Sequence, residues 1–140
     1  MRSLSSLIKE EATRLGFNLI GFTSATPHPH QSFFKSWLAK GYGATMEWLK
    51  RGEEKRGNPQ LVLENAKSLI CCGLNYYCGR PKSIESVEEG KGWISNYAWG
   101  EDYHDVVLEK LKRLEDFIRI QNPSAKMKSY VDTGPILERS

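Results

Sequence analysis

Hydrophobic and polar residues follow a helical period near both ends of this chain. Over Ser3–Leu15 apolar side chains recur at helical spacing, and Gly16 then stands where helices commonly end. The longest such pattern covers Tyr103–Ile120, with Asp102 in the position of an N-cap. Its polar positions predict an outer face covered largely by Lys110, Lys112, Arg113 and Glu115.

The middle of the chain predicts shorter elements. Helices are expected over Ser32–Lys40, Ala44–Arg51 and Pro59–Ala66. The first of these would bury an aromatic face made of Phe33, Phe34 and Trp37. The charge-rich stretch Lys50–Gly57 is typical of a solvated loop.

Apolar stretches between the helices predict strands over Phe17–Phe22, Ser68–Tyr76 and Lys126–Val131. Leu19 and Ile20 make the first of these too apolar for an exposed edge, and Ser68–Tyr76 is expected to lie centrally in a sheet. Cys78–Trp93 has no period and predicts a mobile loop. Because strands and helices alternate, the expected fold class is α/β, or a layered α+β sandwich.

The stretch Tyr130–Arg139 places a carboxylate at the end of a predicted strand. Asp132 precedes Gly134 and Pro135, and the residues from Ile136 begin a helical pattern. One interpretation is that Asp132 or Thr133 caps this helix, with Pro135 in its first turn. The other is that the corner carries a functional site. From these residues alone, the cap is favoured.

Composition favours one cytoplasmic, globular domain. The chain has 140 residues, of which 39% are hydrophobic and 26% are charged, with a formal net charge of +3. That mild positive balance permits contact with a phosphate backbone but does not require it. The longest apolar run, Leu69–Leu74, is far shorter than the roughly 20 residues of a membrane span, and the amino terminus lacks the apolar core of a signal peptide.

Cysteine and histidine spacing argues against a metal site. Cys71, Cys72 and Cys78 match no zinc or iron–sulfur motif, and their expected role is that of small buried apolar side chains. His28 and His30 are separated by a proline and have no nearby third ligand in the sequence. We therefore predict no metal-binding residue.

Three stretches together carry a family resemblance: Lys55-Arg56 before Asn58-Pro59, Ile94–Asp105, and Val131–Pro135 followed by Glu138-Arg139. In this order they resemble the amino-terminal part of epoxyqueuosine reductase, an oxidoreductase of queuosine biosynthesis. The resemblance implies that residues 1–140 form the amino-terminal part of a nitroreductase-like cobalamin-binding domain. It also implies reduction of epoxyqueuosine to queuosine in tRNA.

The resemblance assigns roles to single residues. Asp132 matches the family's proton donor and also a cofactor contact, and the other cofactor-binding positions are Arg56, Ser95, Tyr97 and Leu137. Asn96 stands where many relatives carry arginine. Asp102 and His104 belong to the same block and either line the pocket or serve as an N-cap and a first-turn histidine.

The resemblance implies that relatives continue past Glu138-Arg139 to complete the cobalamin-binding domain and then add a ferredoxin-like domain that holds two [4Fe-4S] clusters. We therefore expect this chain by itself to lack the route from an external electron donor and to be inactive. The family is monomeric, and a shortened chain has the option of dimerising. Two alternatives are a non-catalytic remnant or binding module, and a nitroreductase-like flavin protein, whose phosphate-binding arginines are not evident in the sequence.

Overall fold

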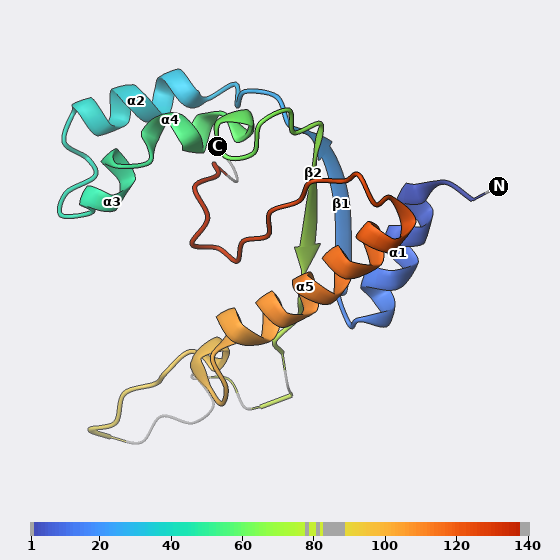
Figure 1. Ribbon diagram of the computed structural model, residues 1–140. Helices are drawn as coiled ribbons and strands as arrows, with labels where there is room; N and C mark the ends of the chain where they lie inside the picture. The colour runs from blue at the N-terminus through green and yellow to red at the C-terminus, as the bar shows by residue number, and fades with distance from the viewer. Residues whose placement is uncertain (1, 78, 81, 83–88, 138–140) are drawn as a thin grey trace. The chain divides into compact units, whose positions relative to one another are not determined.

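The structure is a computed structural model, and it describes residues 2–77, 79–80, 82 and 89–137 (Figure 1). The chain divides into two compact units. The first unit consists of Met1–Ile20 and Cys72–Val131, and the second consists of Gly21–Cys71 and Asp132–Ser140. The described elements include helices and a two-stranded sheet, as an α/β fold class requires.

Two antiparallel strands form the sheet. β1 (Leu19–Ser24) pairs with β2 (Ser68–Gly73), and the amides of Asn18 and Ala25 donate to the carbonyls of Gly73 and Lys67 at opposite ends of the pair. The prediction of a central strand over Ser68–Tyr76 was wrong, because β2 has one partner among the described residues. Within the described part of the chain both strands are therefore edges, and Leu19 is 73% exposed where a covered position was expected.

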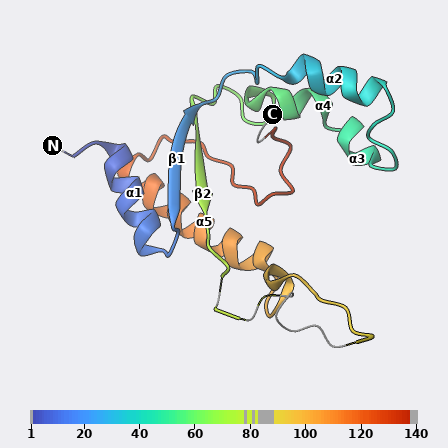
Figure 2. The ribbon, with the colours of Figure 1, turned by 180° about the vertical axis from the view of Figure 1, so that it is seen from behind.

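The first unit is built on two long helices that lie side by side in both views (Figures 1 and 2). α1 (Leu4–Arg14) and α5 (Tyr103–Gln121) match the predicted ranges to within two residues. The apolar seam between them buries Ile8, Ala12, Leu114 and Ile118. Burial of this seam explains why the hydrophobic period alone located both helices.

Side chains and backbone close the helix ends. Ser3 caps α1, which the sequence analysis did not predict. Asp102 caps α5 by accepting the His104 amide, as predicted. Gly16 has φ of +94°, in the left-handed region that ends many helices. Lys110 was expected to point to solvent, but its Nζ donates to the Leu15 carbonyl at 2.6 Å and satisfies the end of α1.

The second unit is built from short elements: α2 (Gln31–Ala39), α3 (Glu47–Lys50), α4 (Glu53–Gly57) and the 3₁₀ turn η1 (Pro59–Leu61). The charge-rich stretch predicted as a loop contains α4, so that prediction was wrong. Ala44 has φ of +45°, which delays the start of α3 beyond the predicted residue. Phe33, expected in the core, is 69% exposed, and Leu38 is the buried residue of α2.

Residues 122–137 contain neither helix nor strand. The predicted strand over Lys126–Val131 was wrong, although its side chains alternate between half-buried and exposed positions from Ala125 to Ser129. Asp132 and Thr133 form a turn, and no helix begins at Pro135 within the described residues. The capping interpretation of Asp132 is therefore wrong for the described chain, while Glu138 and Arg139 lie outside it.

Three smaller predictions concern the remaining chain. Cys71 is exposed and Cys72 half-buried rather than fully buried, because the β2 edge is open, and Cys78 lies outside the described residues. Where the predicted loop Cys78–Trp93 is described, it forms no helix or strand. Within the described residues, no helix combines the length and the apolar character that crossing a membrane requires.

Candidate functional site

The second unit brings two predicted site residues into direct contact. The backbone amide of Leu137 donates to the carbonyl of Arg56 at 2.9 Å. Pro135 lies near the other end of α4, at its start. A Cβ built on Gly52, the residue before α4, would stand 3.9 Å from the Pro135 Cβ. The chain beyond the Asp132 turn is thereby fastened to α4.

The Arg56 side chain presents an unused hydrogen-bond donor. Its guanidinium carbon lies 5.1 Å from the centre of the Trp48 ring, a cation–π distance. Its Nε is buried and has no hydrogen-bond partner among the described residues. Because a buried donor without a partner costs free energy, this nitrogen is suited to a ligand acceptor.

Asp132 occupies an exposed position in the turn that precedes this contact. Gly134, two residues later, is buried, and the amide of Ile136 donates to its carbonyl at 2.9 Å. The residues that follow the turn are therefore held in place, while the Asp132 carboxylate within the turn is exposed. Arg56, Asp132 and Leu137 belong to the second unit, whereas Ser95 and Tyr97 belong to the first.

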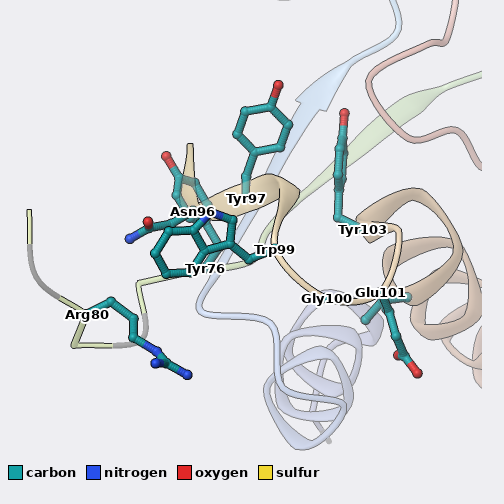
Figure 3. Close-up of a pocket in the computed structure, with 9 residues that line it drawn as sticks. Tyr76, Arg80, Asn96, Tyr97, Trp99, Gly100, Glu101 and Tyr103 are labelled. Atoms are coloured by element: carbon teal, nitrogen blue, oxygen red, sulfur yellow. The ribbon is translucent and has the colours of Figure 1, made fainter. Parts of the chain in front are cut away.

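The first unit holds an aromatic pocket of about 560 Å³ (Figure 3). The Tyr97 ring lies 6.4 Å from Tyr76 and 5.7 Å from Tyr103, edge to face in both cases. Figure 3 shows Tyr97 and Tyr103 projecting toward the same side, and Glu101 directed away from them. The pocket is lined by Tyr76, Arg80, Asn96, Tyr97, Trp99, Gly100, Glu101, Tyr103 and Val106.

Asn96 gives this pocket a polar feature that its aromatic walls lack. It begins the short turn η3 (Asn96–Ala98), and its Oδ1 is buried without a hydrogen-bond partner among the described residues. Ser95 is exposed and accepts the Ala98 amide through its carbonyl. Tyr97 is 51% exposed. The pocket thus combines aromatic faces with one unused acceptor, which suits a planar group bearing an N–H.

His104 and Asp102 form a pair at the start of α5. Asp102 accepts from the His104 amide at 2.9 Å, and the same oxygen lies 2.7 Å from the His104 Nδ1. These contacts, the backbone one foremost, lower the pKa of Asp102. The His104 ring also lies 4.1 Å from the Tyr103 ring. Both residues thus have the structural roles that the sequence offered as alternatives, N-cap and first-turn histidine.

Glu115 is a buried carboxylate that the sequence analysis misplaced on the surface. It is 8% exposed and accepts from Ser129 Oγ at 2.5 Å and from Lys112 Nζ at 3.1 Å. Burial raises the pKa of Glu115, but the bonds from Ser129 and Lys112 outweigh it, so the net shift is downward. Glu115 lies four residues after Leu111 and three before Ile118, which puts it on the inner face of α5. The sequence alone therefore contained the signal that Glu115 is buried.

Histidine and cysteine chemistry adds little to the site. His28 accepts the His30 amide through Nδ1 at 3.2 Å, and the two rings are tilted with centres 5.6 Å apart. The described residues contain no group of three or more His, Cys, Asp or Glu side chains arranged to hold a metal ion.

Comparison with known proteins identifies the family. The family described as "Epoxyqueuosine reductase QueG, DUF1730" matches residues 56–133, more than half of the chain. The epoxyqueuosine reductase of Prochlorococcus marinus (strain NATL2A) is 33% identical over 98% of this chain and 43% of its own length. The chain thus spans about two fifths of the length of this curated relative.

Solved structures agree with that comparison. An epoxyqueuosine reductase crystallised with an epoxyqueuosine-modified tRNA stem loop aligns with a TM-score of 0.77 and 32% identity, over 96% of this chain and 36% of that one. The Bacillus subtilis enzyme, with its catalytic loop swung out of the active site, aligns with a TM-score of 0.73 and 32% identity, over 96% of this chain and 35% of that one. The chain belongs to the epoxyqueuosine reductase family.

Proposed function

We propose that this chain forms the cobalamin-binding part of an epoxyqueuosine reductase, an oxidoreductase that converts epoxyqueuosine to queuosine in tRNA. The observation that carries the proposal is the buried Nε of Arg56, a donor without a partner among the described residues. It belongs to the residue that the family resemblance assigns to the cofactor. In this proposal, the α/β fold is the first portion of a nitroreductase-like domain.

The residues present fit a corrin edge, which carries amide side chains. Arg56 Nε would donate to an amide carbonyl of the corrin. The Trp48 ring next to the guanidinium presents its aromatic face, which has no hydrogen-bond acceptor atom. Leu137 has already given its amide to Arg56, so its remaining polar group for such a contact is its carbonyl. The family resemblance also assigns Ser95 and Tyr97, which belong to the first unit, to the cofactor.

Asp132 would deliver the proton in this reaction. Loss of the epoxide oxygen as water needs electrons at carbon and protons at oxygen, and cobalamin supplies reducing power when bound. Asp132 is exposed, so a substrate oxygen can reach its carboxyl group. Holding a proton near neutral pH requires that bound ligands bury the carboxyl group, because burial disfavours its charged form.

The remaining partners follow from the same assignment. A relative bound to an epoxyqueuosine-modified tRNA stem loop supports tRNA as the substrate carrier. We further propose a cytoplasmic monomer, with an external electron donor and two [4Fe-4S] clusters held outside residues 1–140. Among the described residues, no group of three or more His, Cys, Asp or Glu side chains is arranged to hold such a cluster.

The test is to titrate the purified chain with cob(II)alamin and to record the visible spectrum. Binding is detected as loss of the spectral signature of the coordinated lower base. We expect binding, with Arg56→Ala weakening it by roughly tenfold or more, as for a lost hydrogen bond from a charged group. Arg51→Ala, five residues earlier and exposed, is the matched control and should bind normally. Absence of any spectral change, or equal loss in both variants, would reject the cofactor assignment.

A further inference from the structure

Glu115 is the buried charged residue of the described chain, and it has two hydrogen-bond donors of different kinds. Lys112 precedes it on the same helix, and 56% of the lysine side chain is exposed. Such a pair contributes little, since solvent screens the lysine charge. Ser129 lies beyond the end of α5 and is half-buried. The Ser129 bond therefore joins two separate parts of the chain.

The segment around Ser129 has few other directional contacts. Among the described residues, none of residues 126–131 takes part in a hydrogen bond between backbone groups. Lys128 stacks its Nζ over the Tyr130 ring at 5.4 Å, but that contact stays within the segment. Half-buried side chains at Ala125 and Met127 add non-directional packing. The Glu115–Ser129 bond thus sets the position of the segment along α5.

Asp132 follows Ser129 by three residues, and the Leu137–Arg56 bond lies beyond it. Residues 130–136 therefore run between two ties, one at each end. We propose that Glu115 is a positioning residue, which acts through Ser129 to fix the start of the loop that carries Asp132. The inference rests on the proposed function, because it gives Asp132 a reaction to serve.

The chemistry of the pair suits a fixed point. A carboxylate acceptor forms a stronger hydrogen bond than a neutral one, and α5 is the longest helix of the described chain, anchored by Leu114 and Ile118 on either side of Glu115. Loss of the Ser129 hydroxyl would leave Glu115 with Lys112 alone. The segment would then keep its packing but lose its register on the helix.

The first experiment measures amide hydrogen exchange in the full chain. Ser129→Ala should speed exchange of the hydrogen-bonded amides of Ile136 and Leu137, at the other end of this loop, by roughly tenfold, while α5 stays unchanged. Ser129→Thr, which keeps the hydroxyl, should restore protection. Ser124→Ala is the control, because that exposed hydroxyl bonds to Asn122 nearby. Equal acceleration in α5 would mean that Ser129 merely stabilises the fold, and it would overturn the proposal.

The second experiment measures turnover of epoxyqueuosine tRNA by a reductase that contains residues 1–140 together with the iron–sulfur domain that the proposed function requires. Ser129→Ala should lower kcat roughly tenfold with KM unchanged, since proton delivery rather than binding is affected, and Ser129→Thr should recover it. Asp132→Ala separates the two hypotheses. If it leaves turnover intact, the proposed function fails. If it abolishes turnover while Ser129→Ala changes neither kcat nor exchange, the role of Glu115 is rejected.

Discussion

The two compact units differ in what holds them together. In the first, two long helices bury an apolar seam that includes Ile8 and Leu114. In the second, few side chains are buried, Ala25 and Leu38 among them, and the short helices rely on close backbone approach at Gly57 and on the Leu137–Arg56 bond. Burial of apolar side chains is non-directional, whereas a hydrogen bond requires a particular distance and angle.

That difference places stability and the proposed chemistry in different parts of the chain. Arg56, Asp132 and Leu137 all belong to the second unit, whose parts are short and separately fastened. Helices of four or five residues have little stability of their own, so their tertiary contacts decide their shape. We therefore expect mutations in the apolar seam of the first unit to have the largest effect on stability, and mutations at the ties of the second unit to have smaller effects on stability and to change local geometry.

The largest effect should come from the seam. Leu114→Ala removes a side chain that is 3% exposed and leaves a cavity between α1 and α5, which should lower the free energy of unfolding by about 2–5 kcal/mol. Urea denaturation measures the change. Ile120→Ala on the same helix, where the side chain is 75% exposed, should change it by less than about 0.5 kcal/mol. Similar losses of unfolding free energy in both variants would contradict the claim that the apolar seam stabilises the first unit.

A smaller loss is expected at the tightest contact of the second unit. A Cβ at Gly57 would lie 2.3 Å from Gln31 Cγ, so Gly57→Ala should destabilise by about 1–3 kcal/mol through overpacking. The same change made together with Gln31→Ala should cost clearly less, because the clashing side chain is gone. A double-mutant cycle by denaturation measures the coupling. Independent, additive effects would show that the Gln31 side chain does not restrict position 57.

Sequence patterns located the first unit well for a physical reason. α1 and α5 are long enough for an apolar period to stand out, and both carry side-chain caps, at Ser3 and Asp102. The error at Glu115 arose from residue type, because a charged side chain was assigned to the surface although its spacing pointed inward. Only a partner such as Ser129, fourteen positions away, makes that burial acceptable.

The second unit was harder to predict because its contacts join residues distant in sequence. Nothing local indicates that Gly57 packs on Gln31 or that Leu137 bonds to Arg56. The stretch Lys126–Val131 alternates as a strand does, but a strand also needs a partner, and pairing is not written in one segment. The assignments of Arg56 and Asp132 came from family resemblance, and the contact between Arg56 and Leu137 came from the structure.

Acid should weaken the first unit through Glu115. Its pKa is lowered on folding from the ordinary 4.5, so the ionised group contributes stability above that pH and loses it as the pH falls through the folded value. The Glu115→Gln variant lacks this titration, and the stability difference between the two proteins should therefore shrink as the pH falls below 4.5. Denaturation at several pH values measures it, and a constant difference would contradict the ionised pair.

The smallest effect concerns the helix starts, where the units differ again. Ser3 has ψ of 152°, and its hydroxyl accepts the Ser6 amide, so Ser3→Ala should cost about 0.5–1 kcal/mol in the free energy of unfolding, measured by urea denaturation. His30 precedes α2 with ψ of 14°, outside the extended region in which a capping oxygen reaches back to the helix amides.

His30→Ser should therefore bring no measurable gain, although the same residue type caps α1 at Ser3. Ser5→Ala serves as the control for the loss of an exposed hydroxyl in the first turn of α1. A stabilising effect of His30→Ser would mean that the backbone before α2 adopts the extended geometry at little cost. The contrast between side-chain caps in the first unit and their absence in α2 would then reflect residue choice alone, and not the geometry of the loop.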